Sequence, residues 1–348
     1  MENIHIKAVD FSLEGNNDNQ LASDYVVKRP DAKIYHMPGW CQVITKSFGH
    51  RCYYFLALDN DNVVGVLPLV RQKSRLFGDG FSSLPYLNYG GPLADNDEIE
   101  AALLNHANNI ATDVGVSSVE YRETKLRQGY RQKENKISML LTLPTEEELW
   151  KSIGAKRRAQ VKRPIRLGIE AFKGKAELLD KFYAVLSENM RDLGTPFYSK
   201  HFFRNIIEVF NDYVLLHVIE IDNKPVGAAL VFKFNHVADI PWASTLRSHN
   251  RFGTNMFMYW EVLKDAIASG VKVFDFGRSS KDSGTYRFKK QWGASAKQLY
   301  WNYWLEKGSE LPAVNTDNPK YRLAISVWKK MPLCLTNRLG PMIARNLP

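Results

Sequence analysis

Residues 213–232, YVLLHVIEIDNKPVGAALVF, decide the fold because they have the pattern of a β-hairpin. Apolar and β-branched residues flank a polar Asp-Asn pair, which is typical of two strands joined by a tight turn. Residues 53–70, YYFLALDNDNVVGVLPLV, follow the same plan. Gly65 and Gly227 fall at matching places after the two turns. The sequence therefore predicts the same hairpin at two places in the chain.

The two halves stay similar downstream of these hairpins. Apolar residues recur at helical spacing over 99–114 in the first half and over 257–267 in the second. Each helical pattern precedes a short apolar run, SSVEYR (117–122) or VKVFDFG (271–277). A hairpin, a helix and a further strand in each half predict α/β (α+β) layering. The repetition predicts two similar domains with a cleft between them; the alternative is an accidental likeness of two common hairpins.

Length and composition set the broad class of the protein. The 348 residues suffice for two domains, and 45% of them are hydrophobic. We place the first domain at 1–145, the second at 146–310 and a basic amphipathic tail at 311–348. No apolar run reaches the roughly 18 residues that a membrane-spanning helix needs. The polar N-terminus and three cysteines without a CxxC pair predict a cytoplasmic protein with no metal and no tightly bound cofactor.

The formal net charge of +10 predicts an anionic partner, which can be nucleic acid, a phosphorylated intermediate or an anionic membrane surface. Residues 150–166 carry cations and no acid. If this segment is helical, Arg157, Arg158 and Lys162 form a stripe that can bind phosphates. The alternative is a solvated charged face. Neither a P-loop nor a GxGxxG motif is present, which argues against nucleoside triphosphate hydrolysis and dinucleotide redox chemistry.

Residues 273–293, VFDFGRSSKDSGTYRFKKQWG, combine an acid, a turn, cations and aromatic residues. Asp275 is expected near the carboxyl end of a buried strand, where α/β domains place ligands. Its carboxylate can orient an attacking amine or accept a proton from it. The alternative is that Asp275 pairs with Arg278 or caps the following turn.

The second half of this stretch offers positive charge beside aromatic rings. Lys289 and Lys290 can stabilise a phosphate or a developing oxyanion. Tyr286 and Trp292 can line a pocket beside them. The alternative is an exposed basic strand whose aromatic residues belong to the core.

The sequence NMFMYWEVLKDAIASGVKVFD followed by FGRSSKDSGTYRFKKQWG (255–293) closely resembles the C-terminal signature of FemAB-like proteins. The nearest branch is the one associated with PEP-CTERM/exosortase and exopolysaccharide systems. Residues 35–57, 65–95, 193–203 and 318–341 resemble that branch as well. The resemblance implies two GNAT-like (acyl-CoA N-acyltransferase) domains in tandem, in agreement with the repeated hairpin.

The resemblance also implies an activity. FemAB-type relatives transfer an amino acid from aminoacyl-tRNA to an amine of a peptidoglycan precursor, and other members of the superfamily use acyl-CoA donors. We therefore expect an acyl- or aminoacyltransferase that forms an amide on a phosphorylated or lipid-linked cell-envelope or exopolysaccharide precursor. The alternatives are an acyl-CoA-dependent N-acyltransferase acting on a sugar amine and a non-catalytic module that binds precursors or partner proteins.

This expectation assigns roles to individual residues. The catalytic candidates are Asp275, Lys289 and Lys290. The substrate-binding candidates are Arg157, Arg158, Lys162, Tyr198, Arg278, Tyr286 and Trp292.

Two departures leave the donor open. GNAT acetyltransferases usually hold the CoA pyrophosphate at a helix N-terminus through an R/Q-x-x-G-x-G/A turn. The corresponding residues 249–257 contain only Gly253. The helical-hairpin arm of some aminoacyl-tRNA-using relatives is also not evident. In the tail, apolar and basic residues alternate over 322–333, which predicts peripheral contact with the anionic inner face of a membrane or, alternatively, a helix docked on its own domain.

Overall fold

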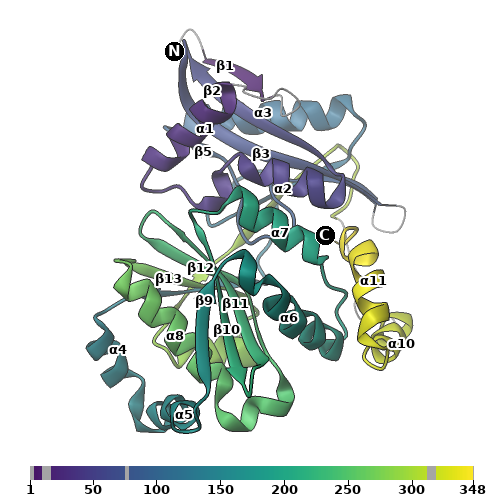
Figure 1. Cartoon of the computed structure of the whole chain (residues 1–348). Coiled ribbons are helices and arrows are strands. Elements are labelled where there is room, and N and C mark those ends of the chain that lie inside the picture. Colours follow the sequence, from purple (N-terminus) through teal and green to yellow (C-terminus); the bar gives the residue numbers. More distant parts are fainter. Residues whose placement is uncertain (1–3, 10–16, 75–77, 312–318, 348) are drawn as a thin grey trace. The chain divides into compact units, whose positions relative to one another are not determined.

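The computed structural model describes residues 4–9, 17–74, 78–311 and 319–347 (Figure 1). The chain divides into two compact units, each described by itself. The first comprises 1–137, 298–314 and 346–348, and the second comprises 138–297 and 315–345. Residues 298–310 thus lie in the first unit, whereas the sequence pattern placed them in the second domain. The two described helices of the expected tail lie in the second unit.

The first unit is built on a sheet with the strand order β1-β2-β3-β4-β6-β15-β7, and β5 pairs with β3. The strands are β1 (Ile4–Ala8), β2 (Arg51–Asp59), β3 (Asn62–Ser74), β4 (Gly78–Ser82), β5 (Leu93–Ala94), β6 (Ser118–Glu123), β7 (Arg131–Lys133) and β15 (Tyr300–Leu305). The helices are α1 (Asn17–Lys28), the short 3-10 helix η1 (Ile34–His36), α2 (Gly39–Phe48) and α3 (Asp97–Asp113).

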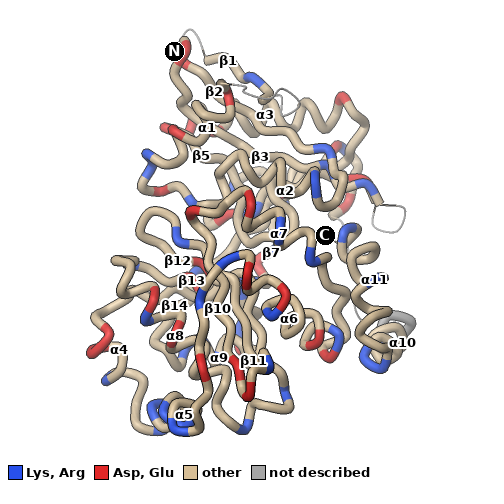
Figure 2. Tube along the Cα trace, viewed as in Figure 1, with Lys and Arg blue, Asp and Glu red and all other residues tan. Residues whose placement is uncertain are grey.

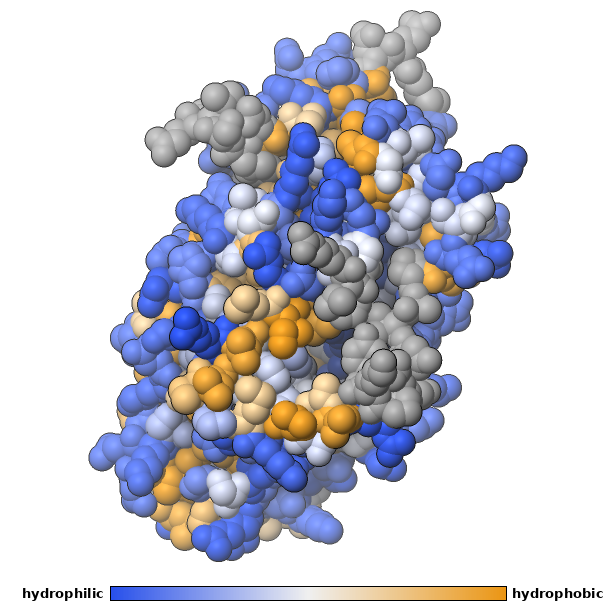
Figure 3. All heavy atoms as spheres, turned by 90° about the vertical axis from the view of Figure 1, so that its right-hand side faces the viewer, coloured by the Kyte–Doolittle hydropathy of each residue, from blue (hydrophilic) through white to orange (hydrophobic). Residues whose placement is uncertain are grey.

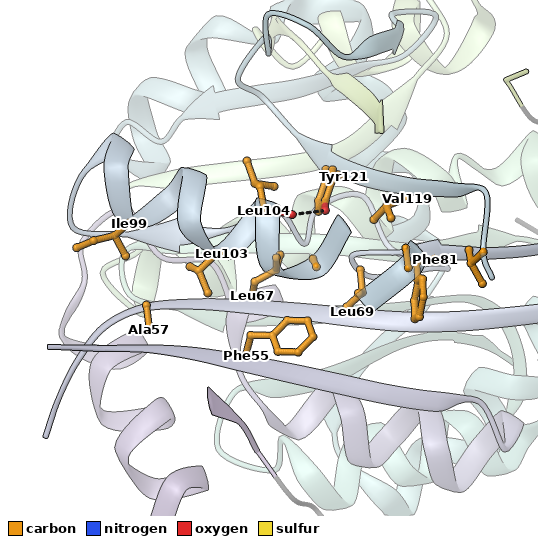
Figure 4. Close-up of a cluster of buried hydrophobic side chains, with 13 residues drawn as sticks. Phe55, Ala57, Leu67, Leu69, Phe81, Ile99, Leu103, Leu104, Val119 and Tyr121 are labelled. Atoms are coloured by element: carbon orange, nitrogen blue, oxygen red, sulfur yellow. Dashed lines mark hydrogen bonds between the residues drawn. The ribbon is translucent and has the colours of Figure 1, made fainter. Parts of the chain in front are cut away.

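Helix α3 supplies much of the core of this unit. Asn96 caps its N-terminus by accepting hydrogen bonds from the backbone N–H groups of Glu98 and Ile99. Acidic side chains in the first turn interact favourably with the positive end of the helix dipole. Figure 4 shows the apolar side of α3 facing the strands, with Leu103 near Phe55. This burial against the sheet stabilises the helix, because local interactions within a single helix are not enough to keep it folded.

The second unit has a sheet of order β14-β8-β13-β12-β11-β10-β9. Its strands are β8 (Ile137–Thr142), β9 (Glu170–Gly174), β10 (Val214–Ile221), β11 (Lys224–Phe234), β12 (Val237–Thr245), β13 (Val273–Ser279) and β14 (Ser295–Gln298). Its helices are α4 (Glu146–Ser152), α5 (Gly154–Arg166), η2 (Ala176–Leu178), α6 (Leu179–Leu193), α7 (Lys200–Val209), η3 (Arg247–Phe252), α8 (Thr254–Ala268), α9 (Gly284–Lys290), α10 (Pro319–Trp328) and α11 (Leu333–Ala344).

Helices cover both faces of this second sheet. Phe232 of β11 stacks edge-on against Phe210, which follows α7, at 5.9 Å between ring centroids. Its neighbour Lys233 instead binds Asp265 of α8, with Nζ 2.5 Å from Oδ2. Because successive residues of a strand point to opposite faces, α7 and α8 lie on opposite sides of the sheet. The strands between them are accordingly apolar on both faces.

The predicted duplication is confirmed by the register of the two hairpins. Gly65 pairs with Ala57 in β2–β3, and Gly227 pairs with Ile219 in β10–β11. In both hairpins the register shifts by one residue immediately beyond this pair. A Cβ on Gly65 would lie 2.9 Å from a side-chain carbon of Ile99, so only glycine fits beneath α3.

The same order of elements follows each hairpin. In the first unit, α3 lies in the chain between β4 and β6, which pair in parallel. In the second, α8 lies between β12 and β13, which also pair in parallel. Both units therefore have the mixed α/β architecture that the sequence predicts.

Within the described residues, no helix is both long and apolar enough to cross a membrane. The same residues contain no group of three or more histidine, cysteine or acidic side chains arranged to hold a metal ion.

Candidate functional site

The cluster of interest in the second unit forms where β13 turns into α9. Ser283 caps α9, its Oγ accepting a hydrogen bond from the backbone N–H of Tyr286 at 3.2 Å. Residues 284–290 are therefore a helix, and the alternative of an exposed basic strand is wrong. Gly277, inside β13, has a φ of +73°, a conformation that favours glycine. The strand bends at this residue, and the side chains around it converge on its backbone.

Asp275 is fully buried and bound to its surroundings. Its Oδ1 accepts hydrogen bonds from Ser138 Oγ at 2.5 Å and from the backbone N–H of Gly277 at 2.8 Å. Asp275 is the third residue of β13, so it lies deeper in the strand than its expected place near the carboxyl end. A carboxylate held in this way orders the backbone around Gly277.

Lys289 folds back from α9 onto the same glycine. Its Nζ donates to the carbonyl oxygens of Gly277 and Arg278, each at 2.9 Å, and the residue is 7% exposed. Burial lowers the pKa of Lys289 to about 8; the nearby Asp275 carboxylate opposes this shift and Arg278 adds to it. An amine with this pKa changes its charge close to neutral pH.

The other predicted residues of the stretch divide between surface and core. Lys290 and Arg278 are exposed, and Lys290 Nζ lies 5.8 Å from the centroid of the half-buried Tyr286 ring. These three can contact a ligand from solvent. Trp292 is 1% exposed and packs edge-on near Phe288, so its indole belongs to the interior of the unit.

The predicted basic segment is the helix α5, and its cations form the blue cluster at α5 in Figure 2. Arg157 Nε donates to Gln291 Oε1 at 3.3 Å, which ties α5 to the end of α9. Arg158 donates to the carbonyl oxygens of Trp150 and Lys151. Lys162 is exposed and its Nζ lies 5.6 Å from the Trp150 ring. The structure thus links the basic helix to the signature stretch.

Helix α5 also covers the start of α8. Gly253 is the N-cap of α8 with φ +86°, and a Cβ there would lie 2.5 Å from the carbonyl oxygen of Gln160 in α5. Thr254, the first residue of α8, is fully buried. Trp150 of α4 packs against Trp260 of α8 at 4.8 Å between centroids. The backbone of α5 therefore lies close to Gly253, the residue immediately before α8.

Tyr198 lies between α6 and α7, in an aromatic cluster of the second unit. Its ring packs edge-on against Phe202 at 5.1 Å and Trp242 at 6.3 Å. Tyr198 also packs near Phe197 and Phe203, and its carbonyl oxygen accepts a hydrogen bond from the hydroxyl of Tyr183 at 3.1 Å. Its predicted substrate-binding role stays a prediction.

A second polar cluster, in the first unit, was missed by the sequence analysis. Arg122 of β6 is 1% exposed, and its Nε donates to Glu120 Oε1 at 2.5 Å. The hydroxyl of Tyr303 in β15 donates to the other oxygen of Glu120. The Arg122 guanidinium lies 4.5 Å from the Trp301 ring. Burial opposes ionisation of Glu120, but Arg122 and Tyr303 outweigh it and lower the pKa of that carboxyl.

The signal for this cluster was three charged residues in the buried strand SVEYRE, where a charge is retained only if paired. The partner strand β15 could not be inferred, because Tyr303 and Glu120 are 183 residues apart.

Known proteins share the fold described above. Residues 155–290, from α5 to the end of α9, match the family model of the acetyltransferase (GNAT) domain. The structure of FemX is similar to 92% of this chain over 100% of its own length, with a TM-score of 0.64 and 15% identity. A tandem GNAT protein from the clavulanic acid biosynthesis pathway is similar to 88% of this chain over 100% of its own, with a TM-score of 0.51 and 12% identity. The chain consists of two GNAT-like domains in tandem.

A further similar structure is the C-terminal domain of a lysylphosphatidylglycerol synthetase from Agrobacterium fabrum. The similarity extends over 89% of this chain and 96% of the length of that domain, with a TM-score of 0.58 and 12% identity. At these identities the likeness concerns the fold. No curated protein matches the chain.

Proposed function

We propose that this protein is an acyl- or aminoacyltransferase that forms an amide on an amine of a cell-envelope or exopolysaccharide precursor. The observation that carries the proposal is the buried Lys289 amine, held at the bend of β13 within the segment that matches the GNAT domain. The resemblance of residues 255–293 to the FemAB-like signature supports the acceptor class. Its PEP-CTERM/exosortase-associated branch supports an exopolysaccharide acceptor.

The reaction needs little beyond positioning and charge stabilisation. The acceptor amine attacks the activated carbonyl of the donor, a C–N bond forms and the carbon–oxygen or carbon–sulfur bond to the leaving group breaks. The amine proton passes to the leaving group or to solvent. Protonated Lys289 supplies positive charge to the oxyanion, or to a phosphate of the acceptor. Asp275 holds Gly277 and so positions Lys289, while Lys290, Arg278 and Tyr286 contact the precursor from the surface.

The cover over α8 favours an aminoacyl ester of RNA over acyl-CoA as the donor. The pyrophosphate of CoA needs free N–H groups at the start of the helix that corresponds to α8. Here the backbone of α5 lies against the residue before that helix, with the carbonyl oxygen of Gln160 close to Gly253. The cations of α5, among them Lys162, instead present a surface that suits the phosphates of an RNA.

The test is a donor screen by mass spectrometry. Purified full-length protein is incubated with charged tRNAs or with acyl-CoAs, each with envelope-precursor extracts. We expect a mass gain on the precursor that requires aminoacyl-tRNA and is lost in Lys289→Met but kept in Lys224→Met, a substitution of an exposed lysine in the β10–β11 hairpin. If the protein binds the precursor but transfers nothing from any donor, it is a non-catalytic binding module and not an enzyme.

A second candidate is an acyl-CoA-dependent N-acyltransferase acting on a sugar amine. The match of residues 155–290 to the acetyltransferase (GNAT) domain favours it. It requires α5 to move away from Gly253. Transfer from acyl-CoA in the same screen, with none from charged tRNA, would establish it in place of the first candidate.

A further inference from the structure

Helices α10 and α11 present an unusual amount of apolar surface to solvent. From Arg322 to Val327 every residue of α10 is exposed, and Leu323 is 67% exposed. On α11, Leu335 and Leu339 are exposed as well. Isolated exposed apolar residues are ordinary, but two neighbouring helices that share this property form a patch that needs a cover.

The two helices are fixed to the second unit by their small or buried residues. A Cβ on Gly340 of α11 would lie 3.0 Å from the carbonyl oxygen of Phe197, and 3.6 Å from the indole of Trp328, which is 9% exposed. A Cβ on Gly194, the C-cap of α6, would lie 2.5 Å from a side-chain carbon of Ile325 in α10. The tail therefore docks on its own unit through residues such as Trp328, while Leu323, Val327 and Leu335 remain exposed.

Charge indicates what covers this patch. Residues 322–345 contain five cations and no acid, with Lys329 and Lys330 at the junction of the two helices. Figure 3 views the side of the molecule on which Figure 1 places α10 and α11, and shows orange hydrophobic surface there bordered by blue. Apolar side chains among lysines and arginines, with no acid among them, match the acyl and phosphate layers of an anionic bilayer.

We propose that the face formed by α10 and α11 binds the surface of an anionic lipid bilayer. Leu323, Val327 and Leu335 enter the boundary between headgroups and acyl chains. Arg322, Lys329 and Lys330 contact lipid phosphates. Neither helix is long enough to span the bilayer, so the contact is peripheral.

The experiment is co-flotation of the full chain with vesicles of phosphatidylcholine alone or of phosphatidylcholine mixed with phosphatidylglycerol. We expect binding at least about tenfold stronger on the anionic vesicles, weakened by salt. In a Cys52→Ser background, Cys334, exposed at the start of α11, takes an environment-sensitive dye whose emission shifts to the blue on binding, because the remaining Cys41 is buried. No donor or acceptor is present, so the outcome is independent of the proposed reaction.

Matched variants assign the binding to the face. Leu323→Gln with Leu335→Gln is expected to abolish flotation, and Val27→Gln with Leu126→Gln, which changes two exposed apolar residues of the first unit, is expected to leave it intact.

Charge variants follow the same design. Lys329→Gln with Lys330→Gln is expected to reduce binding to anionic vesicles about tenfold or more, and Lys46→Gln with Lys224→Gln, at exposed positions elsewhere, is expected to cost much less.

Three results would overturn the proposal. One is the absence of vesicle binding, and another is equal binding by the wild type and both α10–α11 variants. The third is a dimer in solution that becomes monomeric in Leu323→Gln with Leu335→Gln, because the face would then join two copies of the chain.

Discussion

Asp275 and Lys289 bind the same residue from its two ends: the carboxylate accepts the N–H of Gly277, and the ammonium donates to its carbonyl oxygen. The two side chains come from β13 and α9, so the bend of the strand and the start of the helix are fixed together. Lys289 is therefore placed by Asp275 through the backbone.

Lys289→Met is expected to lower kcat/KM about 100-fold, because the charge that stabilises the oxyanion is lost. The carbonyl groups of Gly277 and Arg278 also lose their donor, which costs about 1–3 kcal/mol of unfolding free energy. Steady-state kinetics and urea denaturation measure the two effects. Lys290→Met, at an exposed position, is the control for stability and should change the unfolding free energy by less than about 0.5 kcal/mol. An unchanged kcat in Lys289→Met would remove this lysine from the mechanism.

The pKa of Lys289, about 8, predicts a pH dependence of activity. If the protonated amine stabilises the oxyanion, kcat/KM falls as the pH rises through about 8, and Lys289→Arg, which stays charged, loses this basic limb. A rise in activity through the same pH would instead make the neutral amine the active form. The pH–rate profile of the two proteins decides between them.

The same lowered pKa predicts a pH dependence of stability. Between pH 8 and roughly 10.4, the ordinary value for lysine, the unfolded chain holds the Lys289 proton that the folded chain has released. The contribution of Lys289 to the unfolding free energy therefore increases as the pH rises through this window and is lost as the pH falls back to about 8. Urea denaturation across the window should show the increase in the wild type and not in Lys289→Met.

Asp275→Asn separates positioning from proton abstraction. The amide oxygen of asparagine can still accept the N–H of Gly277, but the negative charge that raises the pKa of Lys289 is gone. We therefore expect activity to persist with its basic limb moved to lower pH. Loss of activity at every pH, with the protein still folded by thermal unfolding, would mean that Asp275 itself accepts the proton of the amine.

Gly253→Ala tests the contact between α5 and α8. The new Cβ would meet the carbonyl oxygen of Gln160 at 2.5 Å and would also strain the backbone at φ +86°. Gly270→Ala is a matched control, because Gly270 has φ +76° but no neighbouring atom within 4 Å of a Cβ. Backbone strain is expected to lower the unfolding free energy of both variants by about 1–2 kcal/mol. Gly253→Ala is expected to lose more than this, because its Cβ also meets α5. Equal losses would mean that α5 yields easily at this point, which would favour the acyl-CoA donor.

The parts of the fold that follow from local periodicity were predictable from the sequence. The hairpins at 53–70 and 213–232 and the strand carrying Asp275 follow from alternation, turn residues and β-branched side chains. The burial of Lys289 could not be predicted from the sequence, because it depends on the lysine side chain reaching back to two carbonyl groups, one of them twelve residues earlier in the chain. Trp292 shows the same limit, since an aromatic ring beside cations has one sequence pattern whether it lines a pocket or fills a core.

The strand β15 has a consequence for how the protein is made. It pairs with β6 and β7 of the first unit, although the whole segment 138–297 of the second unit is synthesised before it. On the ribosome the sheet of the second unit can form first, while β6 and β7 of the first unit still lack the strand that joins them. In a chain that ends at residue 297, the edges of β6 and β7 would stay unpaired, and unpaired strand edges favour aggregation. The sheet of the first unit is therefore completed after that of the second, although the hairpin of the first unit comes earlier in the sequence.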